Sequence, residues 1–319
     1  MHYAIRKLIT LLITLFAISL LAFLAFAVIP GDPAVLQLGV HATPESIEAL
    51  RIEMGLDQPV LVRYAQWLGD MLFGDMGRSF DHGVSVRELL GDRLAITGSL
   101  MTMSFLFTLA IALPIGLLTA RRPAGTKRNR HRAMQGTVTG LTQIMMAASP
   151  LFLGLVLTFV FGVTLRWFVP SAFVSFRDST GGFLWYMLFP ALAIALPKAA
   201  MTVRLIRTSV AEEYAKDYIL TAISRGNGPR AILYRHVLPN IAVPVITFSA
   251  LTLIMMMTDS IVVEQVFSIP GAGRLLISAI RGRDYPVVQA LVVVIAAVVM
   301  VTHTVSDILA RAIDRRITL

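Results

Sequence analysis

Six stretches of this chain lack Asp, Glu, Lys and Arg for long enough to cross, or nearly cross, the hydrocarbon of a bilayer. A membrane-spanning helix needs about 20 such residues, and backbone groups in lipid must hydrogen-bond within the protein. Runs of this length exceed the strands of a membrane barrel. The sequence therefore predicts an all-α polytopic membrane protein with six transmembrane helices. The runs are residues 8–29, 95–120, 133–165, 179–197, 237–258 and 285–306.

Composition agrees with a membrane protein and excludes several chemistries. Only 15% of residues are charged and the mean hydropathy is +0.74, whereas soluble domains carry about 25% charged residues. The absence of cysteine excludes disulfides, thiolate metal sites and a cysteine nucleophile. Arg6 and Lys7 precede the first apolar run as in a signal peptide, but the run exceeds a typical h-region and ends in a poor cleavage site. Residues 1–30 are therefore interpreted as a retained N-terminal transmembrane helix.

The distribution of basic residues predicts the orientation of the chain. Residues 121–132 hold six Lys or Arg and no acid, and short loops of this kind stay on the cytoplasmic side. Six spans then place both termini in the cytoplasm and make residues 31–94 a large external segment. The net charge of +9 is thus explained by orientation. Binding of nucleic acid is not expected, because the basic residues lie beside the spans and form no aromatic platform.

The external segment contains helix signals of its own. Thr43 is a candidate N-cap, followed by Pro44 at the first helical position and by Glu45, and Gly55 suits the C-terminal end. Residues 60–80 are amphipathic and aromatic, and we expect them to lie against the outer surface of the bundle. They could act there as a solvated cap or as a docking surface.

A polar, basic segment separates the fourth and fifth apolar runs. Ser209 is expected to cap a helix whose first turn contains Glu212 and Glu213, where the helix dipole favours acids. Gly226 is expected to end this helix in a left-handed conformation. A turn at residues 227–229 then leads to another helical stretch.

That second short helix is expected to begin at residues 230–237, before Leu238-Pro239 enter the fifth span. The two helices, at about residues 209–236, should lie parallel to the membrane on the cytoplasmic side. Four apolar residues are expected to face the bundle or a partner and three arginines to stay in water: Ile219, Ile223, Ile232 and Leu233, and Arg225, Arg230 and Arg235.

This segment resembles the EAA loop of ABC importer permeases. Ala222, Gly226 and Leu238-Pro239 stand at the matching places, while Leu220 and Thr221 depart from the first two letters of the motif, as is usual in the peptide-transporter branch. Four further stretches resemble that branch in the same order along the chain: "VIPGDPA", "MGLDQPVLVRYAQWL", "FGDMGRS" and "VVEQVFSIPGAGRLLISAIRGRDYPVVQA". Over nearly its whole length the chain resembles the B-type permease subunit of dipeptide, oligopeptide or nickel ABC importers.

The resemblance implies a type I permease bundle with a core domain at residues 95–319 and cytoplasmic coupling helices. It implies a transport subunit in the bacterial or archaeal plasma membrane, without catalytic residues, a metal or a cofactor of its own. The implied partners are a second homologous permease in a heterodimer, two ATP-binding subunits that hold ATP and Mg, and an extracytoplasmic substrate-binding protein. The implied ATPase-coupling residues are Glu212, Glu213, Asp217, Tyr218, Thr221, Ala222, Gly226, Arg230, Leu238 and Pro239.

The residues of this chain agree with ATP binding on separate subunits. The chain contains no G-x-x-x-x-G-K-[ST] phosphate loop. A peptide substrate is favoured, with nickel or glutathione as alternatives. A self-sufficient secondary transporter would show inverted repeats and ionisable groups within its spans, and neither is apparent in the sequence. An intramembrane serine hydrolase lacks its G-x-S-x-G motif here.

Polar residues around the fifth span are candidates for the translocation path. Asp259 could attract the ammonium group of a peptide or form an ion pair near the outer interface. The segment 270–273 could form a gate or a tight external turn. His303 and Asp307 could hydrogen-bond on one helix face, and two such residues are a weak metal site or proton relay. The full set of candidate path and gate residues is Asp259, Glu264, Phe267, Pro270, Gly271 and Gly273.

Two structural expectations concern the third and fourth runs. The third run would be about 50 Å long as one helix, so a kink at Pro150 or an interfacial start near residue 133 is expected. Lys198 and Arg204 end the fourth run and are expected to extend to the inner interface.

Overall fold

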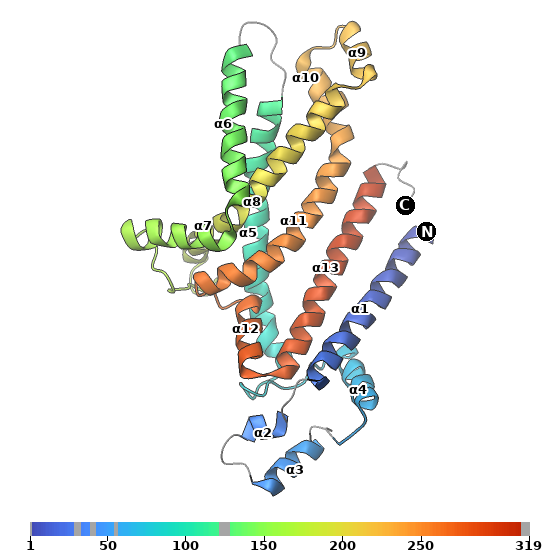
Figure 1. The fold of residues 1–319 in the computed structure, drawn as a ribbon, viewed down its shortest axis with the longest axis vertical. Helices are drawn as coiled ribbons and strands as arrows, with labels where there is room; N and C mark the ends of the chain where they lie inside the picture. The colour runs from blue at the N-terminus through green and yellow to red at the C-terminus, as the bar shows by residue number, and fades with distance from the viewer. Residues whose placement is uncertain (1, 29–32, 39–42, 54–56, 121–127, 314–319) are drawn as a thin grey trace. The chain divides into compact units, whose positions relative to one another are not determined.

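A computed structural model describes residues 2–28, 33–38, 43–53, 57–120 and 128–313 of the chain. These residues are almost entirely helical, and the isolated bridge between Arg78 and Ser85 is their only extended pairing. The predicted all-α architecture is confirmed for this part of the chain (Figure 1).

Five helices are long and apolar enough to cross a membrane, and a sixth candidate is a bent pair. The bent pair consists of α6, Arg128–Ala147, and α7, Pro150–Leu157, which continues into the π-helix η3, Thr158–Thr164. The prediction of six spans therefore holds if the bent pair counts as one of them. The five single spans are α1, His2–Val28; α5, Val86–Ala120; α8, Thr180–Tyr214; α11, Leu238–Val266; and α13, Tyr285–Ile313.

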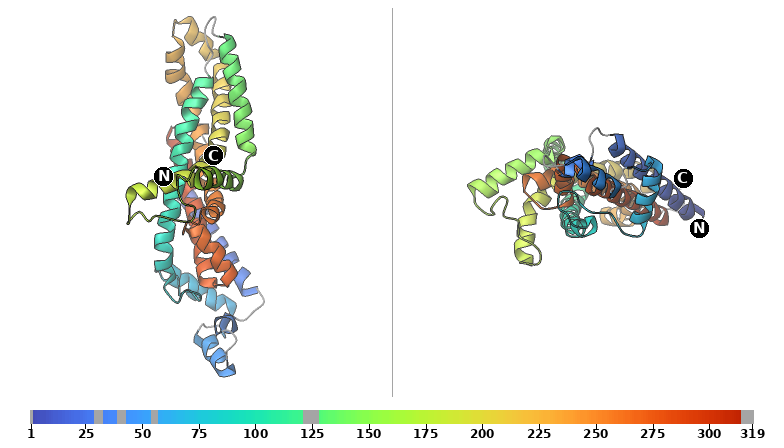
Figure 2. Two further views of the ribbon diagram at one scale, coloured as in Figure 1. Left: turned by 90° about the vertical axis from the view of Figure 1, so that its left-hand side faces the viewer. Right: turned by 90° about the horizontal axis from the view of Figure 1, so that it is seen from below.

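The predicted break at Pro150 is confirmed, and it is far sharper than a kink. The axes of the two helical parts differ by 99°. Ser149 adopts an extended conformation and its hydroxyl accepts a hydrogen bond from the backbone N–H of Phe152 at 3.2 Å. Because Ser149 caps a new helix that begins at Pro150, α6 and α7 are separate helices, and α7 turns away from α6 (Figure 2).

The remaining helices are short. Thr43 caps α3 as predicted: its hydroxyl accepts a hydrogen bond from Ser46 N at 3.3 Å, while Ser46 Oγ accepts one from Thr43 N at 3.0 Å. The expected helix end at Gly55 lies outside the described residues.

The short helices are α2, Pro33–Leu38; α3, Pro44–Glu53; α4, Val60–Leu72; α9, Asp217–Ser224; α10, Pro229–Ile232, with the π-helix η4, Leu233–Val237; and α12, Ala272–Gly282.

The chain packs as two units, and the division expected from sequence, 1–30, 31–94 and 95–319, stays a prediction. One unit contains residues Met1–Ile96 and Pro270–Thr304, and the other contains Thr97–Ile269 and Val305–Leu319. Each unit has a hydrophobic core of its own.

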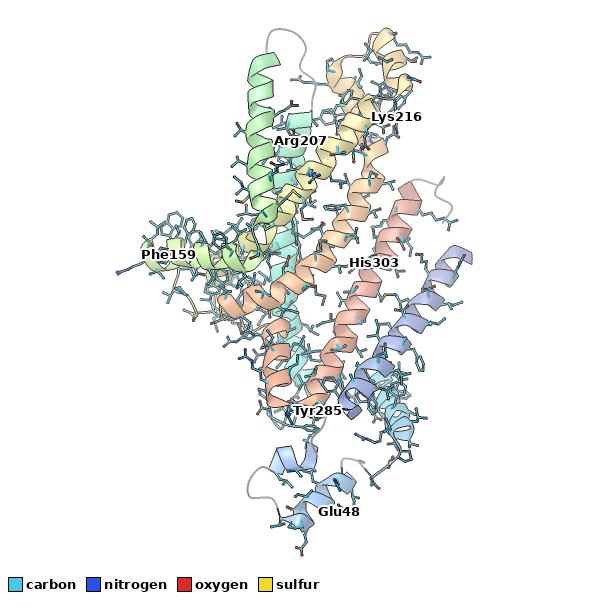
Figure 3. The ribbon with its side chains drawn as sticks, viewed as in Figure 1. Glu48, Phe159, Arg207, Lys216, Tyr285 and His303 are labelled. Carbon is cyan, nitrogen blue, oxygen red and sulfur yellow. The ribbon has the colours of Figure 1, made fainter. Side chains whose placement is uncertain are left out.

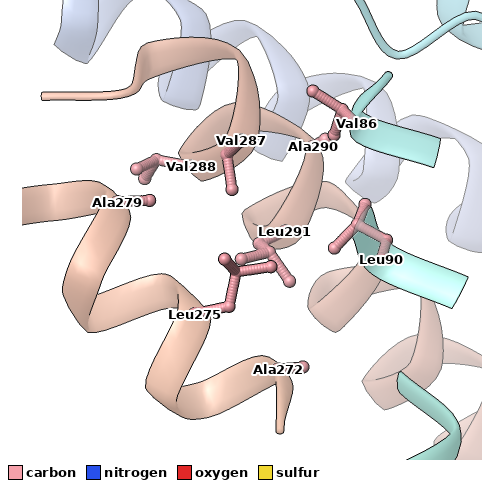
Figure 4. Packing of buried hydrophobic residues seen from close by; sticks show 9 residues of the cluster. All are labelled: Val86, Leu90, Ala272, Leu275, Ala279, Val287, Val288, Ala290 and Leu291. Carbon is pink, nitrogen blue, oxygen red and sulfur yellow. The ribbon is translucent and has the colours of Figure 1, made fainter. Parts of the chain in front are cut away.

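In the first unit, α12, α13 and the start of α5 enclose a core of apolar side chains. Figure 4 shows these side chains pointing toward one another. The amphipathic α4 packs on α1, as expected: the ring of Tyr64 lies 5.5 Å from that of Phe23, and its hydroxyl is 2.8 Å from Ser19 Oγ. The core residues are Val86, Leu90, Ala272, Leu275, Ala279, Val287, Val288, Ala290 and Leu291.

A buried carboxylate holds the segment between α4 and α5 in the first unit. Asp284 is 1% exposed and follows Arg283, the C-cap of α12. Its Oδ1 accepts a hydrogen bond from Phe80 N at 3.1 Å, and its Oδ2 accepts bonds from Asp81 N at 3.4 Å and from the hydroxyl of Ser79. Three donors from one turn therefore satisfy the carboxylate, which fixes that turn against the α12–α13 corner.

In the second unit, α8 is the central helix. It contacts α6, α7 and α11, and it is the most buried of the candidate spans. Figures 1 and 2 show α6 running beside it. A cluster of aromatic side chains lies at one end of the unit. The ring centroids of Phe168 and Phe189 are 4.4 Å apart in a stacked arrangement, and the hydroxyl of Tyr186 donates to the carbonyl of Phe267 at 2.5 Å.

Replacing Asp284 with Ala should destabilise the protein by about 2–4 kcal/mol, because three buried donors would lose their acceptor. The measurement is thermal unfolding of the purified protein in lipid nanodiscs. Asp70→Ala is the matched control, since Asp70 is exposed on α4. Equal unfolding midpoints for Asp284→Ala and the control would contradict the anchoring role.

Candidate functional site

The polar segment after the fourth span starts differently from the prediction. We predicted a new helix capped by Ser209, but α8 continues without a break from Thr180 to Tyr214. The reason is burial: Ile206 and Val210, one helical turn apart, are both buried and extend the apolar face of α8 past Ser209. Glu212 and Glu213 therefore lie at the C-terminal end of α8, and not in the first turn of a separate helix.

Glu213 joins three elements at this end of the protein. It is 5% exposed; Oε1 accepts a hydrogen bond from Tyr218 Oη at 2.5 Å, and Oε2 lies 2.7 Å from Lys216 Nζ. Asn240 of α11 donates to the same Tyr218 hydroxyl at 2.9 Å. The end of α8, the helix α9 and the start of α11 are therefore held together by one polar network. Figure 3 marks Lys216 in this region.

Tyr218 is poised to act as a donor in this network. Burial and the hydrogen bond to Glu213 raise the pKa of the Tyr218 phenol above its usual value, and the amide of Asn240 opposes that shift. The phenol therefore stays protonated at physiological pH and can donate to the carboxylate.

The helix α9 ends as predicted. Gly226 has φ +80°, and its N–H donates to the carbonyl of Ile223 at 2.9 Å. No atom lies within 4 Å of where a Cβ would sit, so a larger residue would be penalised by backbone conformation and not by crowding. The side-chain amide of Asn227 donates to the carbonyl of Ala222 at 3.0 Å and closes the turn.

The second short helix is not a separate element, which corrects the prediction. Residues Pro229–Val266 form one helical run in which α10 and η4 lead directly into α11. Leu233 and Val237 are fully buried, and this burial keeps the run continuous with the span. Pro239 offers no N–H to the carbonyl four residues earlier, which accounts for the wider π turn before it.

The exposed face of this region combines apolar and basic side chains. Of the four predicted apolar contacts, Ile219, Ile232 and Leu233 are buried in the core of the second unit, whereas Ile223 is exposed. The arginines stay exposed, as predicted. Apolar side chains exposed beside charged ones are typical of a docking surface for another protein. Its described members are Leu220, Ile223, Tyr234, Arg225, Arg230 and Arg235.

A polar cleft that sequence reasoning missed lies between α5, α6 and α8. It has a volume of about 490 Å³. Arg207 donates to Thr139 Oγ1 at 2.9 Å, Gln135 donates to the carbonyl of Thr119 at 2.8 Å, and Arg204 lines the same cleft. The sequence signal was weak, because these polar residues are spread over three helices and only packing brings them together.

The predicted path and gate residues occupy different environments. Glu264 and Phe267 are fully buried, and Glu264 Oε1 accepts a hydrogen bond from Thr97 at 2.6 Å. Gly271 is the N-cap of α12, Pro270 precedes it, and Gly273 is the second residue of the helix. The segment 270–273 therefore begins a helix, and its role as a gate stays a prediction.

Asp259 forms an ion pair with Lys198, with 2.8 Å between Oδ2 and Nζ. An ion pair was one of the two interpretations that the sequence left open for Asp259. The expectation that Lys198 extends to the inner interface is wrong, because Lys198 turns toward Asp259 on the neighbouring helix α11. Among the described residues, no group of three or more potential metal ligands is present.

Comparison with known families gives two matches. The family described as binding-protein-dependent transport system inner membrane component matches residues 112–319. The corresponding N-terminal family of the same transport systems matches residues 1–101. Together they account for nearly the whole chain.

Individual relatives carry names from peptide transport. A putative peptide transport system permease protein of Brucella abortus (strain 2308) is 34% identical over 300 residues, 94% of this chain and 93% of the relative. The oligopeptide transport system permease protein AppB of Bacillus subtilis (strain 168) is 32% identical over 318 residues, 99% of this chain and 98% of the relative.

A solved structure shows the same fold. A chain of the MetNI methionine ABC transporter, in an inward-facing conformation, matches with a TM-score of 0.56 and 18% identity, over 71% of this chain and 97% of that chain. The predicted type I permease bundle is thereby confirmed as a fold.

Replacing Glu213 with Ala should release α9 from α8. Loss of a buried acceptor for two donors should raise the amide exchange rate of residues 217–224 by about tenfold, as expected for roughly 1.4 kcal/mol of lost local stability. Hydrogen exchange with mass spectrometry measures this rate. Glu212→Ala is the matched control because Glu212 is exposed at the neighbouring position. Unchanged exchange in Glu213→Ala would refute the network as the tether of α9.

Proposed function

The chain belongs to the family of binding-protein-dependent transport system inner membrane components, and we propose that it forms half of the path of an ATP-driven importer of di- or oligopeptides. It is a multi-pass membrane permease and a transport component. The observation that carries the peptide substrate is the similarity, at 32–34% identity over nearly the full length, to relatives named as peptide and oligopeptide permeases. Their names favour peptides over nickel or glutathione.

ATP hydrolysis is assigned to two partner subunits that hold ATP and Mg, and this chain binds neither. The proposed contact is the face of α9 and the α9–α10 turn, where Leu220 and Ile223 are exposed beside arginines. An amphipathic helix seated in a groove of the partner would bury these residues. The network around Glu213 would transmit movement of α9 into α8 and α11, because it ties α9 to both spans.

The family membership supports the rest of the proposed assembly. A second homologous permease would complete the path as a heterodimer, and an extracytoplasmic substrate-binding protein would deliver the peptide. We propose that both termini lie in the cytoplasm of a bacterial or archaeal cell and that α9 lies on the same side. The basic segment 121–132, most of which lies outside the described residues, supports this orientation.

Gly226→Val should weaken association with the ATP-binding subunits and reduce peptide uptake by about tenfold, since a β-branched residue at positive φ costs roughly 1–2 kcal/mol. Gly228→Val is the matched control: Gly228 has φ −71°, and nothing lies within 4 Å of its Cβ position. Uptake into proteoliposomes and co-purification of the ATP-binding subunits are the measurements. Full uptake with tightly bound partners in Gly226→Val would remove the coupling role from this turn.

Orientation can be tested because the chain has no native cysteine. A cysteine that replaces Gly125 should react with an impermeant maleimide only from the cytoplasmic side, and one that replaces His82 only from outside. Whole cells and inverted vesicles supply the two sides. The reverse labelling pattern would invert the proposed topology.

A further inference from the structure

The ion pair between Lys198 and Asp259 lies within the membrane-spanning helices and away from their ends. Asp259 stands about 10 Å of helix from the end of α11 at Val266, and Lys198 about 27 Å from the start of α8 at Thr180. Transferring two charges out of water costs several kcal/mol per ion, and their mutual attraction only partly offsets this. A charged pair at this depth is therefore poorly explained as a stabilising contact.

Asp259 differs from two carboxylates that the structure buries almost completely. Glu264 accepts a hydrogen bond from a threonine hydroxyl, and Asp284 accepts three from a hydroxyl and two backbone amides. Within the described residues, the carboxylate of Asp259 has Lys198 as its sole polar partner, and Lys198 has no other acceptor. An ammonium group has three hydrogen-bond donors and a carboxylate has about four acceptor sites. Most of the hydrogen-bonding capacity of the two side chains is therefore unused.

Part of the unused hydrogen-bonding capacity is accessible, although Asp259 Oδ2 itself is buried beside Lys198 Nζ. The side chains of Lys198 and Asp259 are 12% and 19% exposed. Met255 and Val262, one turn before and after Asp259, are exposed on α11, and Leu251 and Thr258 continue the same face. Charged residues in spans almost always face a bundle interior or a water-filled cavity, so the pair marks this face of α11 as the side toward the transport path.

We propose that Lys198 and Asp259 form a binding site for a zwitterionic solute in the translocation path. This inference rests on the proposed function, and it gives the chemical class of the ligand at one point of the path. The ammonium group of a short peptide would bind Asp259 and its carboxylate would bind Lys198, so that four charges of alternating sign replace the two-charge pair. Each added contact is a charge-assisted hydrogen bond that the empty site lacks.

Because the two charges of the pair cancel, the site should select a zwitterion over a simple cation or anion. A simple cation drawn to Asp259 meets the ammonium of Lys198 2.8 Å away, and a simple anion drawn to Lys198 meets the carboxylate. Like charges at such separations are strongly unfavourable in a region of low dielectric constant. A solute that carries both charges avoids this repulsion, and the two residues can separate without either charge losing a partner.

The test compares neutral and charge-retaining double variants of the complete transporter in proteoliposomes, with dialanine as the probe and uptake measured per ATP hydrolysed. Lys198→Met/Asp259→Asn should assemble, because it leaves no unpaired charge, but its uptake should fall by about tenfold, equivalent to 1.4 kcal/mol of binding. Lys198→Arg/Asp259→Glu keeps both charges and should keep most of the uptake. Glu48→Gln/Arg51→Met removes an exposed pair at 3.7 Å and serves as the matched control, with no expected loss.

Normal uptake in the assembled Lys198→Met/Asp259→Asn variant would overturn the proposal, since the pair would then be replaceable by neutral groups. Equal loss in the neutral and charge-retaining variants would also overturn it, because shape and not charge would be decisive. A binding protein that captures no peptide, together with an unaltered transporter that takes none up, would count against the proposed substrate and not against the pair. In that case the same variants are compared with the captured solute.

Discussion

Close packing of α8 within the second unit is the constraint on which the rest of that unit depends. Between lipid-facing helices the hydrophobic effect gives little driving force, so association relies on van der Waals contact at short distance. The middle of α8 supplies small residues for this purpose: Ala193, Ala195, Ala199 and Ala200 are all buried. With α6, α7 and α11 packed on it, α8 positions an aromatic group at one end and the α9 network at the other.

The buried carboxylates illustrate how a chain of this kind uses acids in low-dielectric surroundings. Asp284 and Glu264 are satisfied by hydroxyl and amide donors, and they hold a turn and a helix contact in fixed positions. Asp259 has only a counter-ion, which can be shared with or displaced by a ligand. The same side-chain type therefore acts as an anchor where donors are abundant and as a binding group where they are scarce.

Coupling between the cytoplasmic segment and the spans has a simple physical basis. The helix α8 runs unbroken to Tyr214, and α10 runs directly into α11. Both spans therefore continue as helix as far as the segment that contains α9 and the turn after it. Glu213, Tyr218 and Asn240 connect the two helices through α9. A force applied to α9 would reach both α8 and α11, so a short exposed helix is sufficient to couple a partner to the membrane domain.

The sequence by itself determined the helical class, the approximate positions of the spans, the break at Pro150 and the left-handed Gly226, because these follow from local rules: hydrophobic length, proline chemistry and glycine conformation. The family resemblance also lay in the sequence, in motifs that need no structure to read. Tertiary packing alone decided that α8 continues past Ser209 and that η4 joins α11, since burial of Val210 and Leu233 outweighed local capping signals. It also decided the partners of Asp259 and Glu213 and the cleft around Arg207. Such contacts join residues far apart in the chain, and their energies arise only when separate helices meet.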